Sequence, residues 1–360
     1  MGRRKSNYIF APQQRRHRGP GCMILLAAAL LAVFVLVLLS NISMNRRLEV
    51  TAVKVPAMAL DRSFENLTVL HISDLHADPM GHDMNIWRTA LYGKGYSAAV
   101  LTGDMVGKTG DYQPLVSLIN ILRQINAAAP IYFIAGDDDP PPVISAYRGT
   151  PEVLADWVLA AQGAGALYLD APMSQQSDKR TVWFVPEVLY SMDVAGMAES
   201  LARQKADMET LGKQYEADGG ASYRALCNRL DAMERSADAI KAMTPQDLQI
   251  AVSHAPLDVE YVRMAVEWAE PKAVFGFRSV ALVLAGHFVA GQWRLPGIGP
   301  VYVPETGWFP GDEGIVGMQR INSVNQYTSG GVGASSFYPM PGRLFNAPSA
   351  ALLSFTARIE

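Results

Sequence analysis

Cysteine and histidine are scarce in this chain, which contains two cysteines and six histidines in 360 residues. Cys22 and Cys227 stand on either side of an apolar run that is about long enough to span a membrane. A spanning run would place them on opposite sides of the bilayer, so we expect no intramolecular disulfide. Charged residues make up only 18% of the chain, and the formal net charge of −3 argues against a general nucleic-acid binder. Hydrophobic residues reach 49%, which is enough for one large folded domain with an appendage.

The longest apolar run lies near the N-terminus, at residues 23–39, and contains no charged side chain. Its seventeen residues are at the lower limit for a spanning helix and exceed most signal-peptide cores. Residues 40–42 can extend it through the interface, and no small-x-small cleavage site follows. We therefore predict an uncleaved transmembrane signal anchor over residues 23–42.

Basic residues are concentrated before this run, within a tail that spans residues 1–22, whereas only Arg46 and Arg47 follow it closely. The positive-inside rule then places the N-terminus in the cytoplasm and the body outside it, in a single-pass protein of the cell membrane. A solvated or nucleic-acid-binding basic arm is the alternative interpretation of this tail. The bilayer is the partner that the prediction implies.

After a short juxtamembrane linker at residues 43–65, the body extends over residues 66–360. Apolar strand-like runs alternate with amphipathic helical segments, which favours a largely parallel, buried sheet. Short strands after Pro296 suggest a second sheet. Residues 191–245 carry apolar side chains at helical spacing on both sides of a glycine pair, which predicts an inserted helical hairpin. This hairpin either packs on the sheet for stability or covers the site as a lid or membrane-facing cap.

Acidic and histidine residues recur just after the apolar strands. Asp74 and His76 follow the first strand two residues apart, so both side chains leave the same face and can hold one cation, although a surface turn has the same spacing. Ligand-binding groups of open α/β sheets gather at these strand ends. Later strands deliver Asp104, the run Asp137–Asp138–Asp139, His254 and His287.

This ordered series, followed by Arg294-Leu295-Pro296, resembles the calcineurin-like metallophosphoesterases, particularly their membrane-anchored bacterial branch. The resemblance covers about residue 66 to the C-terminus. It implies an α/β fold built as a four-layer αββα sandwich with two mixed sheets. It also implies hydrolysis of a phosphomonoester, phosphodiester or pyrophosphate through a metal-activated water.

The resemblance further implies one or two divalent metal ions, for which histidine and carboxylate ligands favour Mn, Fe or Zn. Asp104 would bridge the two ions and act in catalysis. The first ion would take Asp74, His76 and Asp104, and the second Asp104, Asp137, His254 and His287.

Two positions depart from the family pattern. Asp138 stands where a catalytic histidine is usual, and an ionised carboxylate there would repel the substrate phosphate. Asp138 could act as an acid only if neighbouring carboxylates raised its pKa. Val289 replaces a second histidine of the last block and cannot bind a metal. His82 is a candidate substitute ligand, whereas His71, on the first strand, fits a core position better.

Three interpretations follow: a working phosphoesterase, a degenerate member that binds metal or a phosphorylated ligand without turnover, and a tethered structural protein. The retained ligand types favour the first two. The substrate stays open, since a phospholipid, an isoprenoid or wall-precursor phosphate, or a nucleotide would all suit an anchored, outward-facing site. A phosphorylated small molecule or lipid is thus the expected partner.

Overall fold

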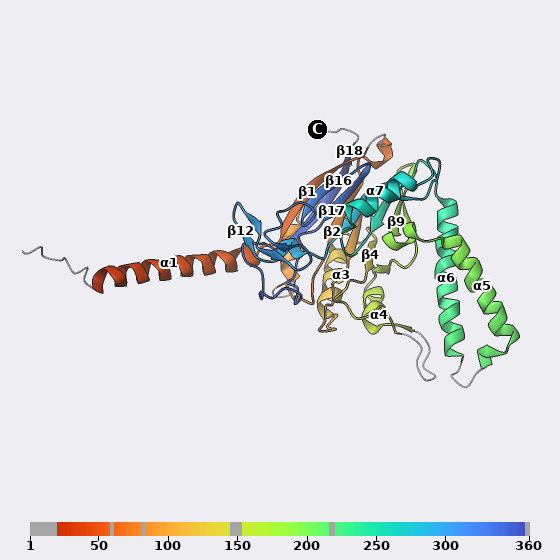
Figure 1. Cartoon of the computed structure of the whole chain (residues 1–360), viewed down its shortest axis with the longest axis horizontal. Coiled ribbons are helices and arrows are strands. Elements are labelled where there is room, and N and C mark those ends of the chain that lie inside the picture. The colour runs from red at the N-terminus through yellow and green to blue at the C-terminus, as the bar shows by residue number, and fades with distance from the viewer. Residues whose placement is uncertain (1–19, 58–60, 81–83, 145–152, 216–219, 357–360) are drawn as a thin grey trace, which may run out of the picture. The chain divides into compact units, whose positions relative to one another are not determined.

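The computed structural model describes residues 20–57, 61–80, 84–144, 153–215 and 220–356 (Figure 1). The chain divides into an N-terminal unit, Met1–Ser43, and a body, Met44–Glu360. Helix α1 (Pro20–Asn45) contains the whole predicted anchor and is apolar on all sides. Its segment Met23–Asn45 has a mean hydropathy of 3.0, so α1 is long and apolar enough to cross a membrane. Residues 1–19 of the predicted tail lie outside the described residues.

The first of the two large sheets of the body has six strands in the order β1-β18-β2-β3-β4-β7. Strands β2, β3, β4 and β7 run parallel, whereas β18 is antiparallel to β2 and parallel to β1, so the sheet is mixed. In the sequence, β1 lies within the predicted linker, but its pairing with β18 makes it part of the body. The bounds are β1 (Glu49–Pro56), β18 (Ser349–Thr356), β2 (Thr68–Ile72), β3 (Ala98–Thr102), β4 (Ile131–Ile134) and β7 (Leu167–Tyr168).

The second large sheet also has six strands, in the order β16-β17-β11-β10-β9-β8. Its four inner strands run parallel, and each outer strand is antiparallel to its neighbour. The bounds are β16 (Gly317–Ile321), β17 (Val324–Thr328), β11 (Val280–Ala285), β10 (Leu248–Val252), β9 (Arg180–Pro186) and β8 (Met173–Ser177).

Apolar side chains on both faces of the strands form separate buried clusters. One cluster takes residues from both sheets, among them Val100 of β3 and Ile250 of β10. A second joins the first sheet to α2 (Asn85–Ala90), α3 (Gln113–Ile125) and α4 (Asp156–Gly163). A third joins the second sheet to α7 (Val259–Trp268). Strands buried on both faces explain why their sequences are continuous apolar runs. The body is a mixed α/β fold.

Two helices, α5 (Val194–Thr210) and α6 (Ala221–Ala242), lie within the predicted insertion and pack side by side, at the far side of the body from β12 (Arg294–Leu295) (Figure 1). Leu201 of α5 meets Leu226 and Leu230 of α6 in a small buried cluster. The guanidinium of Arg235 in α6 forms two hydrogen bonds to the Asp170 carboxylate, at 2.8 and 3.0 Å, which fasten the hairpin to the body. The role of the hairpin as support or as lid stays a prediction.

Short strands complete the described part of the body. One pair, β5 and β6, precedes α4, and two antiparallel pairs follow β11. The two later pairs lie in the segment between β11 and β16, which also contains the exposed aromatic side chains of Trp308 and Phe309. The bounds are β5 (Val143–Ile144), β6 (Val153–Leu154), β12 (Arg294–Leu295), β13 (Gly299–Pro300), β14 (Tyr302–Val303) and β15 (Gly307–Trp308).

Candidate metal site

The six predicted ligand residues all follow the carboxyl ends of strands, and these ends meet at one edge of the two sheets. Tight backbone approach makes this possible: a Cβ atom on Gly103 would lie 2.7 Å from the Gly136 Cα, so the loops after β3 and β4 could not close with larger residues. Asp74 and Asp104 have φ angles of 55° and 53°, in the left-handed region, which turns the chain sharply after each strand.

Asp74, His76 and Asp104 form the first donor group, in which one ligand atom of each lies within 4.8 Å of the others. The His76 Nε2 is 3.7 Å from the Asp104 Oδ2, beyond hydrogen-bond range. This nitrogen is buried and has no hydrogen-bond partner in the described part of the chain. A buried ring nitrogen without a partner, aimed at a carboxylate, fits a metal ligand.

Asp104, His254 and His287 form a second donor group of the same compactness, so the two groups share Asp104. The His254 Nε2 lies 3.4 Å from the Asp104 Oδ2 and 3.2 Å from the His287 Nδ1. The other nitrogen of His254 is 2.8 Å from the Thr102 carbonyl oxygen, which fixes the ring and leaves Nε2 toward the shared carboxylate. Metal-binding histidines are commonly oriented in this way.

Asp137 stands at the margin of the second group, with its side chain 72% exposed. Its Oδ2 lies 3.6 Å from the His287 Nδ1 and 4.0 Å from the His254 Nε2. The structure thus brings all six predicted residues to one place, and their role as ligands remains a prediction.

Burial and neighbouring charges shift the pKa values of three candidate ligands in the site. Burial opposes ionisation of Asp104, but the contact with His254 and the charge of His76 outweigh it and hold the pKa of Asp104 below its usual value. Burial also opposes protonation of His254, yet Asp104 and Asp74 raise its pKa to about 10. Burial raises the pKa of Asp74, which also accepts hydrogen bonds from the His287 backbone N–H at 3.0 and 3.1 Å. A fully buried carboxylate favours a cation beside it.

Asp138, which together with Asp104 is predicted to act in catalysis, lies next to the first donor group. Its Oδ2 is 3.8 Å from the His76 Nδ1, and its Oδ1 is 3.1 Å from the Nζ of Lys108, which sequence reasoning did not single out. The Lys108 side chain is 57% exposed, so its ammonium can offset the repulsion that the Asp138 carboxylate exerts on a phosphate.

Val289 is fully buried, and its φ of 49° is in a region that a β-branched residue rarely adopts. Its Cα lies against Gly331, whose added Cβ would also come 3.1 Å from the Asp74 Cβ. The strained position is therefore the one where the family resemblance implies a metal-binding histidine. Valine supplies no ligand atom there.

Other histidines do not replace that ligand among the described residues. His71 is buried in β2, where its Nε2 lies 2.9 Å from the Thr102 Oγ1, as expected for a core histidine. His82 lies outside the described residues.

Two further acidic residues of the site, Glu305 and Asp139, are not among the predicted ligands. Glu305, in the loop between β14 and β15, places its Oε1 2.9 Å from the His287 Nε2. Asp139 accepts hydrogen bonds from the backbone N–H groups of residues 105, 106, 107 and 136, at 2.7 to 3.2 Å. Glu305 lies in a turn-rich segment without periodicity, whereas the Asp-Asp-Asp run did mark the place of Asp139.

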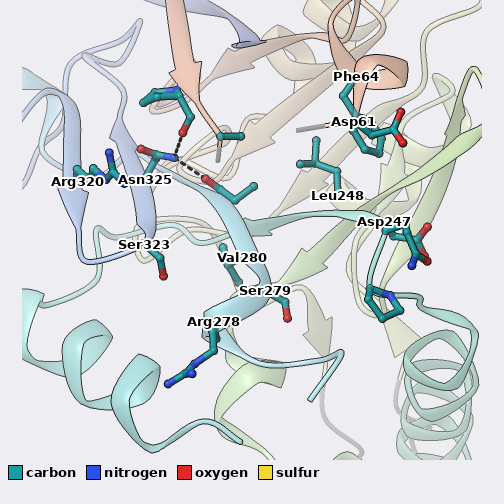
Figure 2. Close-up of a pocket in the computed structure, with 15 residues that line it drawn as sticks. Asp61, Phe64, Asp247, Leu248, Arg278, Ser279, Val280, Arg320, Ser323 and Asn325 are labelled. Atoms are coloured by element: carbon teal, nitrogen blue, oxygen red, sulfur yellow. Dashed lines mark hydrogen bonds between the residues drawn. The ribbon is translucent and has the colours of Figure 1, made fainter. Parts of the chain in front are cut away.

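A separate pocket of about 460 Å³ opens where β10 and β11 begin, at the opposite end of these strands from His254 and His287 (Figure 2). Leu248, Val280 and Asn325 line it, together with Arg278 and Asp247. None of the six predicted ligand residues lines this pocket. It is therefore distinct from the candidate metal site.

No protein-family model matches the chain, and no curated protein matches it either. Among solved structures, the chain is similar to a phosphopantetheinyl hydrolase from Mycobacterium tuberculosis, at 12% sequence identity and a TM-score of 0.34. The similarity covers 74% of this chain and 91% of that chain. A TM-score of 0.34 is too low to transfer a fold or an activity. Membership of the calcineurin-like metallophosphoesterases stays a prediction.

Proposed function

We propose that this chain is a membrane-anchored, metal-dependent phosphoesterase of the calcineurin-like type, with the four-layer sandwich of that family. It would hydrolyse a phosphomonoester, phosphodiester or pyrophosphate. The observation that carries the proposal is the pair of compact donor groups that share Asp104, because a shared carboxylate is what a two-metal phosphoesterase site requires.

Asp74, His76 and Asp104 would hold one cation, and Asp104, His254, His287 and Asp137 the other. Bound divalent cations supply a strong nucleophile at neutral pH and neutralise charge on the phosphate oxygens. Mn, Fe or Zn suits this mixture of imidazole and carboxylate ligands. The His76 Nε2, which is buried and has no hydrogen-bond partner among the described residues, supports the first of these two positions.

The residues of the chain contribute orientation and charge. Without a bound cation, His254 and His76 hold Asp104 ionised through their positive charge. Each ring must be neutral to bind a metal, so bound cations would take over this charge. The Thr102 carbonyl holds His254 in place, and Asp74 binds the His287 backbone. Lys108, at the open side of Asp138, would attract the substrate phosphate.

Catalytically degenerate binding of metal or a phosphorylated ligand is the second candidate. Two observations favour it: the carboxylate of Asp138 in place of a catalytic histidine, and the buried apolar Val289 in place of a ligand. Both candidates require bound metal, so turnover separates them.

The experiment measures hydrolysis of a chromogenic phosphodiester and phosphomonoester by the full-length protein in detergent, with Mn²⁺ or Zn²⁺ added. We expect turnover that a chelator abolishes and that Asp104→Asn lowers by roughly a hundredfold or more, since both metal positions depend on this carboxylate. Glu65→Gln, at an exposed carboxylate outside the site, is the matched control and should keep full activity. Metal binding without turnover would instead establish the degenerate binder.

A further inference from the structure

Large apolar side chains are exposed beside the metal site. We call Ile298, Trp308, Phe309 and Phe337 the apolar rim; their exposed fractions are 61%, 67%, 55% and 50%. Trp308 packs on the Tyr302 ring at 5.0 Å and on the Phe309 ring at 6.4 Å, so part of the rim is one aromatic surface. Exposed apolar surface of this kind marks an interaction site.

The apolar rim adjoins the donor residues. The Phe337 ring lies 6.3 Å from the His287 ring. The loop that joins β14 to β15, and so leads to Trp308, carries Glu305, which contacts His287 at 2.9 Å. A surface that binds the rim therefore also faces the metal site.

The body is attached to α1 at this same edge. Glu49, the first residue of β1, pairs with Ser349, the first residue of β18. Since β18 is antiparallel to β2, Ser349 lies at the carboxyl end of β2, where Asp74 stands. Three residues separate Asn45, the last residue of α1, from Glu49, a span of at most about 14 Å.

Hydrogen bonds connect the attachment point to the rim. The Asn45 Nδ2 donates to the Arg343 carbonyl at 3.0 Å, and the next carbonyl, of Leu344, accepts from the Arg294 N–H at 2.9 Å. The carbonyl of Trp293 accepts from the Val301 N–H at 2.8 Å, and the Val301 carbonyl accepts from the Phe309 N–H at 3.0 Å. The attachment point and the rim thus belong to segments that are hydrogen-bonded to one another, and the rim in turn adjoins His287.

The charges of this face suit a lipid surface. Arg46 and Arg47 are exposed at the attachment point, where anionic headgroups would attract them. The acidic Glu305 is paired with His287, and Asp312 with Arg294 at 2.6 Å; Glu313 is exposed nearby. Tryptophan and other aromatic side chains are the residues that favour the membrane interface.

We infer that the apolar rim docks into the interface of the bilayer that anchors α1, so that the metal site faces lipid phosphate groups. This inference rests on the membrane anchoring in the proposed function and does not require turnover. The occupant to which it commits is phospholipid. A second copy of the chain or a soluble protein would leave the rim away from lipid.

The test uses the full-length protein in nanodiscs of phosphatidylcholine and phosphatidylglycerol, with or without brominated phosphatidylcholine, which quenches nearby tryptophan fluorescence. The chain has six tryptophans, of which Trp308 and Trp268 are exposed at 67% and 79%. Trp268 ends α7, which returns from the carboxyl end of β10 toward the start of β11, at the opposite edge of the second sheet. These two residues are therefore a matched pair.

We expect bromolipid to quench the unmodified protein, Trp308→Phe to lose most of that quenching, and Trp268→Phe to retain it. Equal quenching in Trp308→Phe and the unmodified protein would overturn the docking inference, while metal-dependent hydrolysis would still support the proposed function. Failure of the chain to enter nanodiscs would overturn the anchoring and the docking together. If Asp104→Asn loses turnover but keeps the quenching, the metal site and the lipid-binding rim act independently of each other.

Discussion

At the scale of single residues, the burial of His71 makes the stability of the protein depend on pH. Its side chain is fully buried in β2, and burial lowers its pKa from 6.5 to about 3. Only the Thr102 Oγ1 contacts its Nε2, and its Nδ1 is buried without a partner in the described part of the chain. The neutral ring is therefore the form that the folded state accepts.

We predict that His71 makes the protein less stable in mild acid. The unfolded chain takes up this proton near pH 6.5 and the folded chain near pH 3, so stability from this residue is complete above pH 6.5 and falls as pH decreases toward 3. Between pH 7 and pH 5 the loss is about 2 kcal/mol. Urea unfolding of the full chain in detergent measures it. His71→Leu should remove this part of the pH dependence; an unchanged slope in the variant would contradict the prediction.

The candidate ligands could be found from the sequence because each follows an apolar strand, and strand ends of parallel sheets meet at one edge. Their convergence is observed. Lys108 and Glu305 could not be found in this way, because both lie in irregular segments whose folding depends on contacts far apart in sequence. The strain at Val289 was hidden as well, since a backbone angle is not visible in a residue type.

At the scale of elements, one carboxylate joins the ends of two strands. Asp139, which is 8% exposed, follows β4 and accepts three backbone N–H groups of the loop after β3 and one of its own loop. The loop after β3 contains Asp104, whose Oδ1 in turn accepts the Asp138 N–H at 2.8 Å. The carboxylate that the two donor groups share therefore depends on a residue that is not itself a candidate ligand.

We predict that Asp139→Ala destabilises the body by about 3 kcal/mol, because four backbone donors lose a charged acceptor in a buried place. It should also weaken Mn²⁺ binding, measured by calorimetry, since Asp104 loses its fixed loop. Asp207→Ala, at an exposed carboxylate inside helix α5, is the control and should leave metal affinity unchanged without lowering stability. Full stability together with full metal affinity in Asp139→Ala would show that the loops hold without this carboxylate.

The helices and most strands could be predicted because their apolar periodicity is local. The place of β1 could not. Its pairing with β18 joins residues 300 positions apart, and pairing over such a separation leaves no mark on the alternation of either strand. The alternation of residues 48–53 predicts an edge strand within the linker, as the structure has it, but does not predict that this strand pairs with β18.

At the scale of the whole molecule, the proposed docking would decide which substrates reach the site. The chain enters the body beside the carboxyl end of β2, and we infer that the exposed Trp308 and Phe309 face lipid on this side. If this face lies against lipid, a phosphate in a headgroup is presented directly to the donor residues.

We predict that the double variant Trp308→Ser, Phe309→Ser separates these two kinds of substrate. In nanodiscs, hydrolysis of a lipid phosphoester such as phosphatidic acid should fall by roughly tenfold, the effect of losing about 1.4 kcal/mol of interfacial contact. Hydrolysis of a soluble chromogenic phosphoester should stay unchanged, because neither side chain belongs to the donor groups. Trp268→Ser, on the opposite edge, should affect neither rate. An equal fall for both substrates would mean that the rim supports the site structurally, and equal rates in variant and unmodified protein would mean that lipid is not the substrate presented there.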